Sequence, residues 1–220
     1  MIAAVLFDCD GVLLDTERLA NEINAELLRE AGIPMTYKEC RSQLSGKSDD
    51  QVRQWLQNKY GFLPSTLEAG ATEWSERFVV GVQKLKPVMP GAKELLANMT
   101  LPYAVVTNSS GGELTFKFQE TEMDPYFPDH LRFSGIDLNM PKPAPGAYLS
   151  AAEALGVAPE NCLVIEDTVT GVTAGKNAGM TVWGFSIETD EQVLLEAGCE
   201  RCFNHLNQLL ELIETENTQG

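Results

Sequence analysis

Two carboxylates stand two residues apart near the N-terminus, directly after an apolar run. The run covers residues 3–7, and Asp8, Cys9, Asp10 and Gly11 follow it at once. Acidic groups at the end of a buried strand repel each other and lose hydration, so such a pair is typical of a site that binds a cation or carries out a reaction. We therefore expect Asp8 and Asp10 to belong to a functional site.

Two later apolar runs, at residues 103–106 and 162–165, also end in polar residues. In a parallel sheet the carboxyl ends of the strands lie along one edge, and open α/β sheets bind ligands at that edge. The sequence therefore predicts that these polar residues meet the first carboxylate pair in one pocket. They are Thr107, Asn108, Glu166 and Asp167.

The residue types in these clusters suit the binding of a metal ion and a phosphate. Carboxylate oxygens are the ligands that Mg²⁺ prefers, and a hydroxyl such as that of Thr107, followed by a helix N-terminus, can hold phosphate oxygens. Lys142 stands between two prolines, which stiffen the backbone around a positive charge. Each feature alone is commonly a helix cap or a solvated charge, so the site is indicated by their order at successive strand ends.

Short apolar runs alternate with helical patterns from residue 91 onward. Such continuous runs are typical of strands that are buried on both faces of a parallel sheet. We therefore predict an α/β fold with a doubly wound, mostly parallel sheet. The five predicted strands are residues 2–7, 103–106, 131–133, 162–165 and 180–185.

The segment 17–86 interrupts this alternation and contains no strand-like run. One helix is predicted over residues 19–31, and three capping boxes predict further helices. The boxes begin at Thr36, Ser48 and Ser65. We therefore expect an all-helical cap, residues 17–86, inserted into a discontinuous α/β core that consists of residues 1–16 and 87–220.

The chain of 220 residues carries a formal net charge of -16. This charge argues against nucleic acid and anionic membranes as partners, because both bind basic surfaces. No apolar run is long enough to span a membrane, and the N-terminus shows no signal-peptide pattern, so we expect a cytoplasmic protein. No heptad pattern demands a dimer, and we expect a monomer that acts on a small molecule.

The five cysteines are an odd number, which favours free thiols. Cys199 and Cys202 form a C-x-x-C, but a structural zinc ion needs four ligands and the sequence offers no second pair. We interpret this segment as a strand and a turn.

Four segments together resemble the four motifs of the haloacid dehalogenase-like hydrolases. They are residues 8–17 (DCDGVLLDTE), 106–108 (VTN), 142–145 (KPAP) and 166–171 (EDTVTG). The Asp-Thr-Glu ending of the first motif and the position of the helical insert resemble the β-phosphoglucomutase-like and phosphoglycolate-phosphatase-like branch. The resemblance implies a Rossmann-like core with a helical cap.

The resemblance also implies roles for individual residues. Asp8 is expected to be the nucleophile that forms an aspartyl-phosphate, and Asp10 the general acid and base. Thr107, Asn108 and Lys142 are expected to bind the phosphoryl group. The expected cofactor is Mg²⁺, held by Asp8, Asp10, Asp167 and Glu166.

Three functions fit this sequence. We favour a Mg²⁺-dependent phosphatase of a sugar phosphate or sugar-acid phosphate, such as a hexose phosphate, 6-phosphogluconate or phosphoglycolate. A β-phosphoglucomutase-like mutase is the alternative, although residues 17–21 (ERLAN), shortly after Thr16, contain no histidine and Asp49 stands about where mutases carry an arginine. A non-catalytic phosphate-binding or phospho-accepting module is the third. Arg41 and Lys47 are candidates for substrate specificity.

Overall fold

The computed structural model describes residues 1–44, 49–61 and 71–219. It divides into two compact units, and the chain leaves the first unit and later returns to it. The first unit consists of residues 1–15 and 88–220, and the second of residues 16–87.

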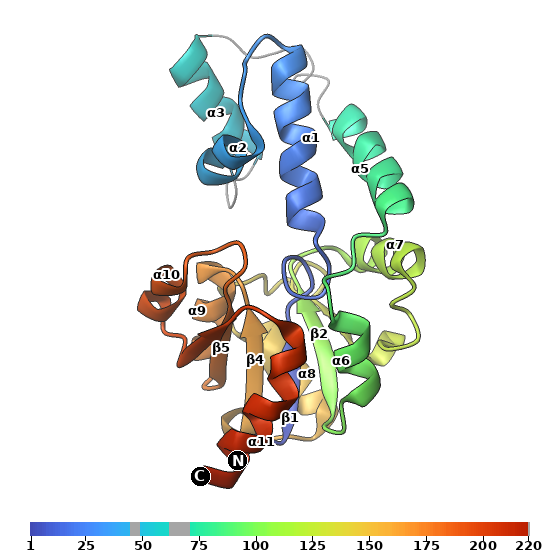
Figure 1. Ribbon diagram of the computed structural model, residues 1–220, viewed down its shortest axis with the longest axis vertical. Coiled ribbons are helices and arrows are strands. Elements are labelled where there is room, and N and C mark those ends of the chain that lie inside the picture. The colour runs from blue at the N-terminus through green and yellow to red at the C-terminus, as the bar shows by residue number, and fades with distance from the viewer. Residues whose placement is uncertain (45–48, 62–70, 220) are drawn as a thin grey trace. The chain divides into compact units, whose positions relative to one another are not determined.

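A parallel sheet forms the centre of the first unit (Figure 1). Within the described residues this sheet has six strands. Their spatial order is β3-β2-β1-β4-β5-β6, with parallel pairing throughout. The first strand therefore lies between β2 and β4, where the strand order reverses and where such sheets bind ligands. The strands are β1 Ala4–Phe7, β2 Tyr103–Thr107, β3 Arg132–Ser134, β4 Cys162–Glu166, β5 Thr181–Phe185 and β6 Arg201–Phe203.

Helices cover both faces of this sheet. Alternate residues of β1 enter different cores, because Ala4 and Leu6 belong to one apolar cluster while Val5 and Phe7 belong to the other. Burial on both faces explains why the first strand has no polar residue. The helices are α6 Ala92–Asn98, α7 Gly111–Thr121, α8 Gly146–Leu155, α9 Val169–Asn177, α10 Glu191–Ala197 and α11 Leu209–Gln219, with short 3₁₀ turns η1 Asp129–Leu131, η2 Pro159–Asn161 and η3 Leu206–Gln208.

The predicted α/β fold with a parallel sheet is confirmed, but one strand was not predicted as part of the sheet. That strand, β6, is only three residues long and reads Arg201-Cys202-Phe203, so it lacks the apolar run that marked the others. It pairs with β5 at the edge of the sheet. The five cysteines are free thiols, as expected.

The second unit is helical in its described part. It contains α1 Thr16–Glu30, α2 Tyr37–Leu44, α3 Asp49–Tyr60 and α5 Ala71–Leu85. Apolar residues of α1, α2 and α3, including Leu28, Cys40 and Leu56, form its core. The capping box at Thr36 is present, since the Thr36 backbone N–H donates to Glu39 Oε2 at 2.8 Å. The boxes predicted at residues 48 and 65 start outside the described residues.

The two connections between the units lie next to each other where they join the first unit. Leu14 and Val88 form an antiparallel bridge. The backbone N–H of Met89 donates to the carbonyl of Leu13 at 2.9 Å. The outgoing and returning segments are thus hydrogen-bonded to each other. In the described part of the chain, we find no helix with the length and apolar character that crossing a membrane requires.

Candidate active site

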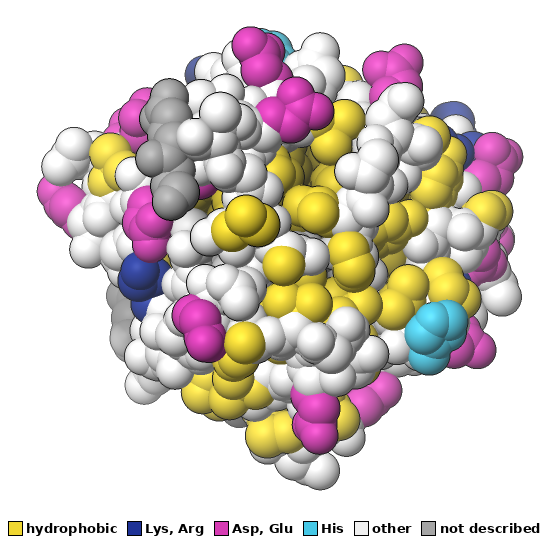
Figure 2. All heavy atoms as spheres, turned by 90° about the horizontal axis from the view of Figure 1, so that it is seen from below, with side chains coloured by type: hydrophobic (Ala, Val, Ile, Leu, Met, Phe, Trp, Pro, Cys, Tyr) yellow, Lys and Arg dark blue, Asp and Glu magenta, His cyan; other side chains and the backbone are white. Residues whose placement is uncertain are grey.

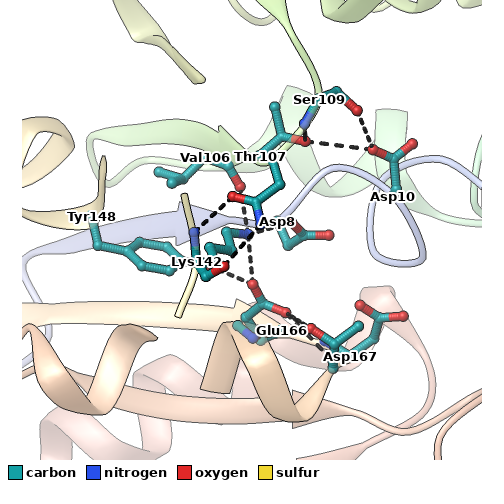
Figure 3. A network of polar contacts seen from close by, with 12 residues as sticks. Asp8, Asp10, Val106, Thr107, Ser109, Lys142, Tyr148, Glu166 and Asp167 are labelled. Atoms are coloured by element: carbon teal, nitrogen blue, oxygen red, sulfur yellow. Dashed lines mark hydrogen bonds and ion pairs between the residues drawn. The ribbon is translucent and has the colours of Figure 1, made fainter. Parts of the chain in front are cut away.

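The carboxyl ends of β1, β2 and β4 bring polar residues from distant parts of the sequence into one place (Figure 3). Asp8 follows β1 directly, and its backbone N–H donates to the carbonyl of Ile165 in β4 at 3.0 Å. Thr107 is the last residue of β2, and Glu166 is the last residue of β4. Adjacent parallel strands thus assemble the site.

Lys142 lies at the centre of a buried ionic cluster. Its ammonium contacts Asp8 Oδ1 and donates to Glu166 Oε1 at 2.6 Å and to the Val106 carbonyl at 2.8 Å. The Tyr148 hydroxyl donates to the same Glu166 oxygen at 2.8 Å. Burial acts to lower the pKa of Lys142, but Asp8 and Glu166 outweigh it and raise that pKa well above its usual range. Lys142 is therefore a fixed positive charge.

The second oxygen of Glu166 binds the start of α9. Oε2 accepts hydrogen bonds from the backbone N–H of Asp167 at 3.2 Å and from the Thr168 hydroxyl at 3.1 Å. Thr168 Oγ1 in turn accepts from the Gly171 N–H at 3.1 Å and caps the helix. A Cβ at Gly171 would lie 1.8 Å from Glu166 Oε1, so a glycine is needed for the helix to come this close. Glu166 thus ties Lys142 to α9.

Three carboxylates of the site can hold a metal ion. Asp8, Glu166 and Asp167 each offer an oxygen, and these oxygens lie within 4.8 Å of one another. Gly11 has a φ of +94°, and a Cβ there would lie 2.1 Å from Asp167 Oδ2, so this glycine makes room for Asp167 beside β1. A donor set made only of carboxylate oxygens fits a hard cation.

The electrostatics of the cluster favour a bound cation. Burial raises the pKa of Asp8 to about 8, the ammonium of Lys142 opposes this rise, and the carboxylates of Glu166 and Asp10 add to it. One ammonium therefore does not balance the negative charge that gathers around Asp8. A cation among these carboxylates would favour their ionised forms.

Asn108 fixes the backbone that carries Lys142. Its side-chain Oδ1 accepts from the Lys142 backbone N–H at 2.8 Å, and its Nδ2 donates to the Lys142 carbonyl at 3.2 Å. Both polar ends of this side chain are thereby used. The amide thus positions the lysine, and the phosphate contact predicted for Asn108 stays a prediction.

Asp10 lies at the rim of the site, where its side chain is 25% exposed. Lys117 Nζ, from α7, donates to its two carboxylate oxygens at 2.7 and 2.8 Å. The Ser109 hydroxyl lies 3.1 Å from Asp10 Oδ2, and the Thr107 hydroxyl lies 3.5 Å from it (Figure 3). A second aspartate–lysine pair thus stands beside the first.

Sequence reasoning missed Lys117 and Tyr148. Lys117 was detectable, because the buried residues of α7 recur at a helical period and the lysine occupies one of these positions. Those buried residues are Leu114, Lys117, Phe118 and Thr121. A lysine on the apolar side of a helix needs a buried partner. Tyr148 gave no comparable signal, because a tyrosine on a buried helix face is commonly a core residue.

The predicted specificity residues belong to the second unit. Arg41 lies in α2 and is partly buried. Lys47 lies outside the described residues. Neither is placed here relative to the α/β unit.

The surface seen in Figure 2 carries more acidic than basic side chains, in line with the net charge of -16. The field around such a protein repels an anion, so the attraction for a phosphate must come from groups within the site. Lys142 is the buried positive charge beside Asp8, and the carboxylates around it fit an added cation.

A model of the haloacid dehalogenase-like hydrolases matches residues 2–179. The chain belongs to this family. The 6-phosphogluconate phosphatase of Escherichia coli strain K12 is 31% identical over 211 residues, which cover 96% of this chain and 94% of that protein. Other relatives are also named phosphatases, so this haloacid dehalogenase-like protein is a phosphoric monoester hydrolase.

Two solved structures extend this comparison. A HAD family hydrolase of Deinococcus radiodurans, with bound phosphate and sodium, has a TM-score of 0.81 and 27% identity, covering 94% of this chain and 93% of its own. A putative β-phosphoglucomutase of Thermotoga maritima has a TM-score of 0.79 and 27% identity, covering 97% and 99%. The predicted family and its β-phosphoglucomutase-like branch are confirmed.

Proposed function

We propose that this protein is a Mg²⁺-dependent phosphatase that hydrolyses a small sugar phosphate or sugar-acid phosphate through an aspartyl-phosphate. The observation that carries the proposal is the environment of Asp8. Its carboxylate is buried, touches the ammonium of Lys142, and lies within metal-sharing distance of Asp167 and Glu166. A buried carboxylate beside a lysine ammonium, at a site where a cation would also fit, suits a nucleophile that must attack an anionic phosphorus.

The first step transfers the phosphoryl group to the protein. An oxygen of Asp8 forms a bond to phosphorus while the bond from phosphorus to the ester oxygen breaks. Asp10, two residues along the chain, gives a proton to the departing alcohol oxygen. Lys142 and the hydroxyl of Thr107 stabilise the negative charge on the transferring group.

The second step returns Asp8 to its starting form. The carboxylate of Asp10 accepts a proton from water, the water oxygen bonds to phosphorus, and the bond from phosphorus to Asp8 breaks. Mg²⁺, when bound, neutralises charge on the phosphoryl oxygens and on the surrounding carboxylates. Asp8 and Asp167 would hold it, with the Asp10 backbone carbonyl and with Glu166 acting through water. Asn108 acts by holding the backbone of Lys142.

The substrate class follows from the relative rather than from the core. The Escherichia coli protein acts on 6-phosphogluconate, a phosphorylated sugar acid, and matches this chain along nearly its whole length. We therefore place 6-phosphogluconate first in a panel that also contains hexose phosphates and phosphoglycolate. Arg41 and Lys47 remain our candidates for selecting among these compounds.

The test is phosphate release from this panel with Mg²⁺ and with a chelator. We expect metal-dependent release, highest for a sugar or sugar-acid phosphate, and an acyl-phosphate that hydroxylamine cleaves after acid quenching. Release only in the presence of a sugar bisphosphate, with isomerised product, would replace the phosphatase by a mutase. Stable labelling without turnover would replace it by a phospho-accepting module.

A further inference from the structure

Lys117 is a buried cation that none of the four family motifs contains. Its side chain is 1% exposed, and within the described residues Lys117 and Lys142 are the two lysines classed as buried. The amphipathic pattern of α7 places it on the side that packs against the sheet. A buried ammonium is unfavourable unless carboxylates or other acceptors surround it.

The ammonium of Lys117 contacts four oxygen atoms of three side chains. It donates to both oxygens of Asp10, and to the Ser109 hydroxyl at 2.8 Å. It also forms an ion pair with Glu113 Oε1, one turn earlier in the helix, at 2.9 Å. Ser109 Oγ lies 3.1 Å from both Asp10 and Glu113, so its single hydrogen can reach either carboxylate. Asp10 is therefore held by a network and not by one contact.

The position of this ammonium is fixed by the fold. The Ser110 side chain accepts from the Glu113 N–H and caps the start of α7. The Thr121 hydroxyl donates to the Lys117 carbonyl at 2.6 Å, and Leu114 and Phe118 pack into the core on the same side. Because the helix cannot shift without losing these contacts, Lys117 presents its donors at a constant place.

The donors of Lys117 dictate what the Asp10 carboxylate can do there. An ammonium only donates hydrogen bonds, so the oxygens that it contacts serve as acceptors. A carboxylate held in this way is ready to take a proton from a water molecule. The same contacts do not assist the donation of a proton to a departing alcohol, which needs a protonated oxygen.

We propose that Lys117 is a positioning residue for the second step of the reaction, which holds the Asp10 carboxylate as the acceptor for the proton of the attacking water. The inference rests on the proposed function. It assigns the two lysines to different steps: Lys142 acts on the phosphoryl group, and Lys117 acts through Asp10 on the water.

The test separates the two steps by kinetics. In Lys117→Met the carboxylate loses its anchor, so hydrolysis of the aspartyl-phosphate slows while its formation is little changed. We expect kcat to fall by about 10- to 100-fold, within the range for loss of an oriented general base. KM should fall in the same proportion and kcat/KM should stay within about threefold, because kcat/KM reports only the steps up to alcohol release. Acid-quenched phosphoenzyme, measured with labelled substrate, should accumulate.

Two matched variants complete the experiment. Lys93→Met removes a partly exposed lysine that pairs with Glu122, and should leave both kinetic constants unchanged. Asp10→Asn with Lys117→Met should be no slower than Asp10→Asn alone, because Lys117 acts through Asp10. If Lys117→Met does not fold, Lys117→Gln, which keeps a neutral donor, is measured in its place.

Contrary outcomes are distinct. A fall in kcat/KM equal to the fall in kcat, with KM unchanged, would overturn the role of Lys117, and so would unchanged kinetics or additive losses in the double variant. Wild-type turnover is measured first on the substrate panel. Its absence rejects the proposed function and this role together, whereas normal turnover without the split between kcat and KM rejects this role alone.

Discussion

The two aspartate–lysine pairs of the site differ in their access to water. The Asp8 and Lys142 side chains are 11% and 5% exposed, whereas Asp10 is 25% exposed and its partner Lys117 is 1% exposed. In the first pair both charges lie inside the protein, and in the second pair only the lysine does. This difference suits the roles that we propose, in which the inner aspartate takes part in covalent chemistry and the outer one transfers protons with water.

The pairs also differ in how their charge is shared. Lys142 lies between Asp8 and Glu166, both buried, so one ammonium faces two carboxylates with little help from solvent. Lys117 also has two carboxylate partners, but Glu113 is 45% exposed and water solvates it. An added cation would therefore stabilise the inner pair, Asp8 and Lys142, more than the outer pair, Asp10 and Lys117.

The largest expected effect is the loss of the inner carboxylate. Asp8→Asn keeps the size of the side chain but removes the attacking oxygen, so phosphate release should fall by about 10⁴-fold or more. Asp129→Asn, which changes a surface aspartate that is 99% exposed, is the matched control and should retain full activity. Residual turnover of Asp8→Asn within tenfold of wild type would mean that the attacking group lies elsewhere.

Removal of the inner lysine should be the next largest effect. Lys142→Met leaves Asp8 and Glu166 buried without their shared ammonium, so we expect about 3–5 kcal/mol of lost stability and a loss of about 10²- to 10³-fold in kcat. Lys117→Met should lose only about 1–3 kcal/mol, because its carboxylate partners remain hydrated. Urea denaturation in the presence of a chelator measures the loss of stability in the two variants. Equal losses would contradict the distinction between a buried and a rim pair.

The inner pair also predicts a pH dependence of stability. Burial raises the pKa of Asp8 to about 8, so between about pH 4 and 8 the folded, metal-free protein binds a proton that the unfolded chain does not. Its free energy of unfolding should therefore decrease as the pH rises across this interval. Stabilisation by Mg²⁺ should increase over the same interval, because the metal binds the ionised carboxylate.

Thermal melting with Mg²⁺ or a chelator, at pH 6 and pH 9, measures this effect. The shift in Tm on adding Mg²⁺ should be larger at pH 9. Asp8→Asn, which cannot titrate at this position, should reduce the difference between the two pH values. A shift that is equal at both pH values in the wild type would place the titrating group outside the metal site.

The smallest expected effects come from two glycines, one near each pair. In Gly171→Ala the new Cβ would lie 1.8 Å from Glu166 Oε1, so Glu166, which contacts Lys142, must shift. We expect the free energy of unfolding to fall by about 1–3 kcal/mol. Gly112→Ala, in α7, meets nothing within 4 Å and should stabilise by about 0.5–1 kcal/mol. Chemical denaturation of the two variants measures both. A destabilised Gly112→Ala would show that α7 tolerates less change than its open surroundings indicate.

The sequence predicted the inner pair better than the outer one, for a physical reason. Asp8, Glu166 and Asp167 follow apolar strands directly, and the edge of a parallel sheet brings strand ends together whatever the chain does between them. Lys142 was found through its flanking prolines and the family motif. The resemblance implied that Lys142 lies near Asp8, because both act on the phosphoryl group, but its contact with Glu166 could not be read from the sequence, because a loop brings the lysine to that edge.

The outer pair depends on a helix packing angle, which a sequence does not state. The helical pattern of α7 indicates that Lys117, ten residues beyond β2, is buried, but only the packing of α7 makes Asp10 its partner. Similarly, the sequence predicted a strand and a turn around Cys199 and Cys202 but not that this strand, β6, joins the sheet, because only its pairing with β5 defines that. The prediction of specificity residues had the least support, because Arg41 and Lys47 were chosen for their position in the helical unit and not for their local chemistry.

The bridge between Leu14 and Val88 has a consequence for how such a protein can change. The chain leaves and re-enters the α/β unit at this bridge, so the 72 residues of the second unit form one insertion whose two ends are hydrogen-bonded to each other. An insertion of different length or fold could replace the second unit at this bridge without altering the register of any strand in the sheet. If the second unit selects the substrate, as we propose for Arg41 and Lys47, new substrate preferences can arise by replacing this unit while the residues at the sheet edge stay unchanged.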